Sequence, residues 1–442
     1  MREPLYKTRR IAPAAAQFDT GCARINDFIV MSEGNSNVYL IETPAGGILI
    51  NSGMGFEAPV HRHNLGKFSD TPIRYLVTTQ GHVDHVGGVQ YFRDLHPGLV
   101  YIAQAGNPEH QEYDARLQAF RSARAAFRFQ DDFRAVFERY AAAGYVAINP
   151  QDRPTPDVLF EKRHEFSLGG LDVVLIAAPG AETNDSLVVW LPQHRIVFTG
   201  NLFGCPFGHF PNLVTIRGDR YRDALTCAAA AQTVLDLEAQ LLLYGHHEPV
   251  AGADLIRAEL TAYRDAIHHV HDAVVRGMNE GKDLCTLQNG ISLPPECEVG
   301  QGYGKLNWSI RAIWENYAGW FKHESTTELY SVPQKTIHAD LARLAGADQL
   351  VQLAEGKTAA GEHEQALHLL DIVLNAEPGH AGARALAIQV HETLLADART
   401  FCTTGNFWLV GWLQNRIKVL KGGETPADRK STRLNSSHVA LS

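Results

Sequence analysis

No two cysteines of this sequence stand close enough together to suggest a paired thiolate site. The six cysteines are scattered over 442 residues without a C-x-x-C pair, so the sequence indicates neither a thiolate zinc site nor a disulfide framework. Apolar runs of about 18 residues are also missing, and we therefore predict no membrane span. Residues 1–17 contain no apolar stretch of signal-peptide length, which leads us to expect a cytoplasmic protein.

Long basic runs are equally scarce. The sequence has 40 Lys and Arg residues against 49 Asp and Glu residues, and the net charge of -9 argues against a nucleic-acid-binding surface. Hydrophobic residues make up 45% and charged residues 20%, which is typical of a globular protein. A chain of this length predicts two or three domains, each able to bury its own core.

Apolar, β-rich runs alternate with helical or loop stretches in the first part of the chain. They recur between residues 28 and 250, and the alternation predicts a layered α/β domain over residues 1–255. Between His110 and Gly144, alanine, arginine and phenylalanine recur at helical spacing. We expect helices inserted there between strands, covering the site discussed below.

The strand pattern fades after residue 255. Helical periodicity continues to residue 402 and predicts an all-α domain over residues 256–421. Apolar faces within residues 350–395 indicate stacked antiparallel helix pairs. These pairs are too few to form a solenoid, so we expect the helices to pack against the first domain or against another copy of the chain. Residues 422–442 are polar, rich in serine and arginine and without periodicity, and we predict that they form a disordered tail. The sequence of this tail differs in character from the domain before it and resembles a read-through artefact.

One loop carries the clearest chemistry in the sequence. Within a glycine-flanked segment that follows the apolar run 73–77 stand Gln80, His82, Asp84 and His85. A strand that ends in such a tight loop can direct two imidazoles and a carboxylate into one cavity, and these ligands suit zinc or a similar cation. The loop therefore predicts a metal site; the alternative is a polar loop with chance histidines.

The same loop resembles the H-x-H-x-D-H signature of the metallo-β-lactamase superfamily. Three of the four ligand positions match, and the resemblance implies that His82 binds a first metal while Asp84 and His85 bind a second. Gln80 stands where the first histidine is usual and could offer only a neutral carbonyl oxygen, a weak zinc ligand. The resemblance implies the αβ/βα sandwich fold of that superfamily.

Further metal ligands are implied by resemblance to the alkylsulfatase branch of the superfamily. Glu182 follows the apolar run 173–177, where that branch uses a glutamate for the first metal; the alternative is an exposed loop acid. Asn201 occupies the usual place of a bridging carboxylate. His246 matches the late histidine ligand, with His247 beside it to polarise a ligand or a bound water.

The number of bound cations stays open. Two divalent cations against Asp84 and Glu182, with a bridging hydroxide, leave the centre about one unit positive, and such a centre attracts an anion. One cation held by Asp84, His85 and His246, with water in the fourth position, is an equally well formed catalytic arrangement. We therefore expect one or two Zn²⁺ ions, with other divalent metals as alternatives.

Basic and amide side chains follow soon after Asn201. Residues 208–224 resemble the Asn-Leu-x-Thr-Leu-Arg-Gly stretch of alkylsulfatases, in which the arginine helps to hold the sulfate group. The resemblance implies that Arg217 binds substrate, together with His209 and Asn212, because a guanidinium can fork two hydrogen bonds onto a tetrahedral oxyanion. The alternative for Arg217 is an ion pair with a nearby aspartate at the surface.

The helical domain resembles the dimerisation domain that follows the catalytic domain in alkylsulfatases. Residues 308–321 and the alanine-rich helices between 341 and 395 carry this resemblance, which implies a homodimer. We interpret the aromatic stripe formed by Trp308, Trp314, Tyr317 and Phe321 as core or interface.

These features predict a metal-dependent hydrolase with Asp84 and Arg217 as catalytic residues. A water activated by the metal would attack a small anionic ester, and by resemblance the ester is an alkyl sulfate. Hydrolysis of thioesters, lactones or phosphoesters remains an alternative, as does a dimeric binding or scaffold protein with a degenerate metal site, which Gln80 and Asn201 favour. The choice between C–O and S–O cleavage stays open.

Overall fold

A computed structural model describes residues 3–402 and 405–422 of the chain. The chain divides into two compact units, the first ending at Asn316 and the second beginning at Tyr317. The first unit extends past its strands to include α6 (Ala253–Asn279) and α7 (Leu284–Gly290), whereas the sequence places a domain boundary after residue 255. Apart from Gly422, the predicted tail 422–442 lies outside the described residues.

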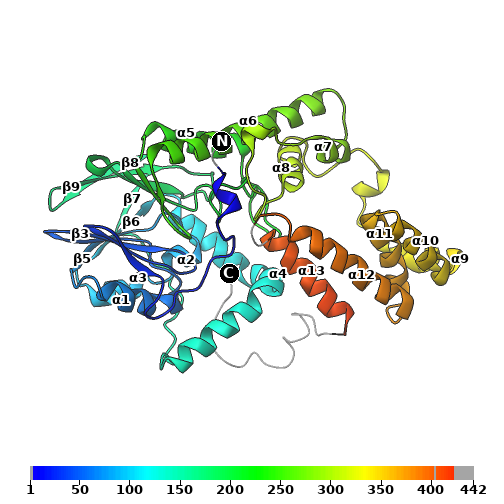
Figure 1. Cartoon of the computed structure of the whole chain (residues 1–442), viewed down its shortest axis with the longest axis horizontal. Helices are drawn as coiled ribbons and strands as arrows, with labels where there is room; N and C mark the ends of the chain where they lie inside the picture. Colours follow the sequence, from blue (N-terminus) through cyan, green and yellow to red (C-terminus); the bar gives the residue numbers. More distant parts are fainter. Residues whose placement is uncertain (1–2, 403–404, 423–442) are drawn as a thin grey trace. The chain divides into compact units, whose positions relative to one another are not determined.

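Two mixed sheets form the centre of the first unit (Figure 1). The first sheet consists, in spatial order, of β1 Cys22–Asn26, β2 Ile29–Ser32, β3 Val38–Thr43, β4 Gly46–Ile50, β5 Ile73–Val77, β6 Val100–Gln104 and β7 Val158–Phe160. The second consists of β13 Val250–Ala251, β12 Leu241–Tyr244, β11 Ile196–Gly200, β10 Leu187–Leu191, β9 Leu171–Ala177 and β8 Arg163–Leu168. Strands β4 to β7 pair in parallel, as do β11 and β12.

The two sheets pack together through aliphatic and aromatic side chains. On β4, Ile48 and Ile50 belong to the cluster that also contains Val189 and Phe198 of the second sheet, whereas Leu49 belongs to a cluster on the opposite face. This alternation follows the two-residue period of a strand. Because β4 is buried on both faces, its sequence reads as a continuous apolar run.

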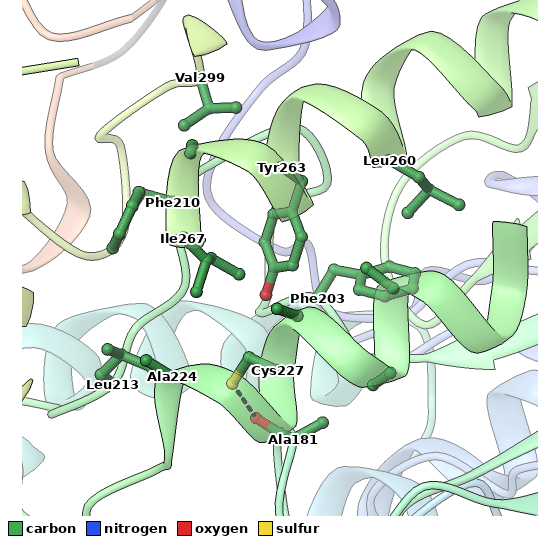
Figure 2. Packing of buried hydrophobic residues seen from close by; sticks show 14 of the residues in the cluster. Ala181, Phe203, Phe210, Leu213, Ala224, Cys227, Leu260, Tyr263, Ile267 and Val299 are labelled. Carbon is green, nitrogen blue, oxygen red and sulfur yellow. Dashed lines mark hydrogen bonds between the residues drawn. The ribbon is translucent and has the colours of Figure 1, made fainter. Parts of the chain in front are cut away.

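Helices cover the outer faces of both sheets. The first sheet packs against α1 (Ala58–Gly66) and α3 (Val89–Leu95), and the second against α5 (Ala224–Asp236) and α6. Figure 2 shows Tyr263 and Ile267 of α6 above Cys227 of α5, whose thiol donates a hydrogen bond to the Ala181 carbonyl at 3.1 Å. The layers are those of the predicted αβ/βα sandwich.

A long helix, α4 (Asn107–Ala142), is inserted between β6 and β7, as the sequence predicts. It buries several polar residues, which are His110, Gln111, Asp114 and Arg121 among others. The remaining short elements of the first unit are η1 Leu5–Lys7, η2 Gly55–Glu57, α2 Val83–Val86, η3 Pro192–His194, η4 Pro295–Cys297 and most of α8 Leu306–Ala318.

The second unit contains helices and connecting loops, and no strand, within its described residues. Its elements are η5 Thr326–Leu329, η6 Gln334–Ile337, α9 His338–Ala345, α10 Ala347–Ala359, α11 His363–Ala376, α12 Ala381–Ala398 and α13 Phe407–Leu420. Buried Ala354, Leu370 and Val390 share one core, so α10, α11 and α12 stack as the predicted helix pairs.

Candidate active site

The short helix α2, which follows β5, and the loop after β12 bring Asp84, His85 and His246 together. One carboxylate oxygen and two ring nitrogens, one from each residue, all lie within 4.8 Å of one another. Asp84 Oδ2 is 3.5 Å from His85 Nε2 and 4.0 Å from His246 Nε2. His85 Nε2 is buried and has no hydrogen-bond partner among the described residues. Two imidazoles and one carboxylate, with the buried Nε2 of His85 left without a partner, fit a divalent cation.

Neighbouring hydroxyl and amide groups fix the His85 ring. Thr79 donates its hydroxyl hydrogen to Asn51 Oδ1 at 3.1 Å, and its Oγ1 lies 3.3 Å from His85 Nδ1. The Thr79 oxygen can therefore accept from Nδ1–H, which leaves the Nε2 lone pair for a metal. Burial lowers the pKa of His85 and of His246 to about 3, so both rings are neutral, as metal binding requires.

Two of the residues predicted to hold a first metal, Gln80 and Glu182, have other partners. The Gln80 amide hydrogen-bonds His82 Nδ1 at 2.6 Å, and Glu182 Oε1 accepts a hydrogen bond from Arg222 at 2.8 Å. Asn201 Oδ1 is buried without a hydrogen-bond partner in the described part of the chain. Neutral amides and a carboxylate already paired with a guanidinium are a weak donor set, so this position fits a cation less well than the Asp84 cluster.

A buried network of arginines and carboxylates includes the predicted substrate-binding residue. Asp219 forms ion pairs with Arg121 at 2.8 Å and with Arg217 at 3.6 Å, and the Arg217 side chain is 18% exposed. Burial raises the pKa of Asp84, and its electrostatic interactions with His246 and Arg217 oppose that rise. Arg217 thus interacts electrostatically with Asp84. It also forms an ion pair with Asp219, which was the alternative to sulfate binding considered from the sequence.

The two other predicted substrate-binding residues are both buried. His209 is 1% exposed and its Nδ1 accepts a hydrogen bond from the Gly302 amide at 3.0 Å, so its ring packs against backbone. Asn212 is 4% exposed and its carbonyl accepts a hydrogen bond from Arg222. The side-chain oxygen of Asn212 has no partner within the described residues, which leaves it available to a ligand.

Sequence reasoning missed three polar residues next to the site, which are His110 and Asp114 of α4 and Arg222. One turn apart on α4, His110 and Asp114 place their donor atoms within 4.8 Å of a His82 ring nitrogen. Arg222 holds Glu182, as described above. The His110 to Asp114 spacing was a readable signal, because residues four apart share one face of a helix.

Models of known protein families match both parts of the chain. The model described as metallo-beta-lactamase superfamily matches residues 31–246, and the model described as alkyl sulfatase dimerisation matches residues 287–416. The chain joins a metallo-beta-lactamase domain to an alkyl sulfatase dimerisation domain. The predicted fold and family are therefore confirmed.

The curated relatives of this metallo-beta-lactamase-fold chain include alkylsulfatases. A linear primary-alkylsulfatase of a Pseudomonas species is 27% identical over 346 residues, which cover 75% of this chain and 65% of the relative. An alkyl/aryl-sulfatase of Saccharomyces cerevisiae is 25% identical over 431 residues, which cover 91% of this chain and 63% of the relative. The chain is thus a distant homologue that spans somewhat under two thirds of these relatives' length.

A solved structure shares the fold. The stereoselective inverting sec-alkylsulfatase from Pseudomonas sp. superposes with a TM-score of 0.77 at 22% identity, covering 92% of this chain and 66% of that one.

Among the residues that the structure describes, every helix is too short or too polar to cross a membrane.

Proposed function

We propose that this chain is a metal-dependent hydrolase of anionic esters, and that alkyl sulfate esters are its substrate class. The convergence of Asp84, His85 and His246 within 4.8 Å carries this proposal. Three protein donors with an open position are typical of catalytic zinc sites, whereas structural sites use four protein ligands. The distant homology to alkylsulfatases supports the choice of ester.

A divalent cation held by these three residues would supply Lewis acidity toward an ester oxygen and toward water. The chain itself supplies proton transfer. The Asp84 carboxylate has a second oxygen besides Oδ2, which faces His85 and His246, and that second oxygen could accept a proton of the attacking water. Asp84 therefore combines metal binding with general-base catalysis.

Arg217 would bind the sulfate group. Its ion pair with Asp219 occupies Nη2, and a guanidinium has five N–H donors in a planar fork, so other donors can meet two sulfate oxygens. Charge that develops on the leaving sulfate in the transition state is stabilised by the same group. The Asn212 amide oxygen could accept a hydrogen bond from a protonated group of the substrate.

We also propose that the chain forms a homodimer through its second unit, which the dimerisation model covers for most of its described length. The described second unit exposes large apolar side chains that a partner copy could cover, namely Trp320, Tyr330, Val332 and Leu344.

Turnover of a substrate panel by the zinc-loaded full chain tests the proposed hydrolase. Dodecyl sulfate and nitrophenyl sulfate would be compared with nitrophenyl phosphate, an acyl thioester and a lactone. We expect sulfate release to be the fastest reaction, and Asp84→Ala to lower kcat about 10²- to 10⁴-fold because both a ligand and a base are lost. Asp94→Ala, which removes an exposed carboxylate from α3, serves as the matched control and should keep full activity.

Three outcomes would contradict the proposal. Preferred thioester, lactone or phosphate turnover would assign another substrate class to the same fold. Equal turnover by Asp84→Ala would remove Asp84 from the mechanism. Failure to cleave every ester, in a folded chain that holds zinc, would favour a binding or scaffold protein.

A further inference from the structure

A second cluster of ligand atoms joins the metal-binding loop to α4. One ring nitrogen each of His82 and His110 and one carboxylate oxygen of Asp114 all lie within 4.8 Å of one another. His110 Nε2 is 3.7 Å from Asp114 Oδ2, and the centroids of the two imidazole rings are 5.0 Å apart. The three residues are 7%, 3% and 6% exposed, so the cluster is buried.

Amide side chains hold both imidazoles by their Nδ1 atoms. His82 Nδ1 is hydrogen-bonded to the Gln80 amide at 2.6 Å, and His110 Nδ1 to Asn184 Oδ1 at 2.8 Å. An acceptor on Nδ1–H leaves the Nε2 lone pair for a metal. The Asn184 side-chain oxygen already faces His110 Nδ1. The Gln80 side-chain oxygen would face His82 Nδ1 after the amide group is flipped, which exchanges its oxygen and nitrogen, two atoms of nearly equal size.

The Nε2 atoms of His82 and His110 are themselves unsatisfied. Both are buried, and neither has a hydrogen-bond partner within residues 3–402 and 405–422. A buried polar atom without a partner costs free energy. Two such nitrogens beside one carboxylate would be satisfied together by a cation.

We propose that His82, His110 and Asp114 form a divalent-cation site, for which Zn²⁺ is the expected ion because the donors are two nitrogens and one carboxylate oxygen. This site uses the His82 imidazole in a different donor set from the one implied by Gln80 and Glu182. Two residues of α4 take the place of the ligands that the loop has lost. The site is separate from the Asp84 cluster, and its binding of a cation does not depend on the proposed hydrolase activity.

The geometry requires only small movements of the three side chains. Donors in a tetrahedral zinc site lie roughly 3.4 Å apart, so atoms now within 4.8 Å must approach by about 1 Å. Asp114 Oδ1 is held by Arg121, which leaves Oδ2 facing His110. A cavity of about 540 Å³ reaches the cluster and gives an entry path; its lining includes Gly81, Val83, Gln111, Asp114 and Gln151.

Charges around the cluster cancel before a cation binds. Asp114 and Asp219 are balanced by Arg121 and Arg217, with which they form ion pairs. A divalent cation would therefore leave the group about two units positive. Such a charge next to Arg217 would favour a sulfate group, and this last step alone rests on the proposed function.

Zinc titration of the chelator-treated full chain, followed by calorimetry, tests the site without any substrate. We expect the native chain to bind two equivalents of Zn²⁺. His110→Gln and Asp114→Asn should each bind one equivalent, as should His246→Gln, and the double variant of His110 and His246 should bind none. His61→Gln is the matched control, because it removes a buried imidazole outside both clusters and should leave two equivalents.

Circular dichroism and thermal melting establish that each variant is folded. If His110→Gln does not fold, Asp114→Asn still tests the site. A single equivalent in the native chain that His110→Gln and Asp114→Asn both retain would overturn the site. Two equivalents in both His110→Gln and Asp114→Asn would overturn it as well, and would assign the second cation to Gln80, His82 and Glu182. Loss of ester hydrolysis with both equivalents still bound would contradict the proposed function alone.

Discussion

His61 is a buried imidazole whose surroundings hold it in the neutral form. Its Nδ1 is 2.8 Å from the Ser32 hydroxyl oxygen. A Cβ added at Gly34 or Gly53 would come within 2.6 or 2.5 Å of its ring, so the imidazole lies against two backbone segments with no room to spare. Burial lowers the pKa of His61 to about 3.

We predict that His61→Gln reduces the acid sensitivity of the fold. An unfolded histidine has a pKa of about 6.5, so below that pH the unfolded chain binds a proton that folded His61 does not. The free energy of unfolding then falls with decreasing pH, by at most roughly 1.4 kcal/mol per pH unit from this residue, until the folded pKa of about 3 is reached. Urea denaturation of the metal-free chain at several pH values measures the slope. Identical slopes in the two proteins would mean that folded His61 takes up the proton.

Gln80 marks the limit of what the sequence predicts about single residues. Its neutral amide could be recognised as a poor zinc ligand from residue type alone. That it hydrogen-bonds His82 Nδ1 instead depends on two side-chain rotamers within one loop, which no spacing rule specifies. In the same way, the sequence is compatible with Arg217 binding a sulfate group or forming an ion pair with an aspartate. In the structure Arg217 forms an ion pair with Asp219.

At the scale of elements, strands and helices were predictable because their apolar patterns are strong. The continuous apolar run of β4, which is buried on both faces, and the helical periodicity of α10 to α12 predicted these elements directly. Strand ends were harder. Gly200 at the end of β11 has φ +53°, and an added Cβ would lie 2.3 Å from Thr79 Oγ1, the hydroxyl that contacts His85. This need for glycine comes from Thr79, in the segment that follows β5 of the other sheet, so the residues around Gly200 in the sequence do not reveal it.

Helix α4 was predicted as a helix that covers the site, but none of its residues was predicted as a metal ligand. Its sequence places His110, Asp114 and Arg121 on one side, and such polar residues normally face solvent. They are buried because Asp219, 98 residues further along, pairs with Arg121. Contacts between distant segments therefore determine which face of α4 is buried beside His82.

At the scale of the whole molecule, we predict a homodimer. Light scattering after size-exclusion chromatography should give twice the mass of one chain. Replacing exposed Trp320 and Leu344, which are 68% and 76% exposed, by serine should shift the mass toward one chain, because burial of their apolar surface stabilises association. Phe120→Ser, at a side chain that is 56% exposed on α4, is the matched control and should remain dimeric. A native mass of one chain would refute the dimer.

The metal centre of Asp84, His85 and His246 is the central claim, and anomalous X-ray diffraction at the zinc edge tests it most directly. In crystals of the full chain grown with Zn²⁺, we predict a peak within about 2.3 Å of Asp84 Oδ2, His85 Nε2 and a His246 ring nitrogen. Zinc absent from these three residues, and found instead only between Gln80, His82 and Glu182, would contradict the claim.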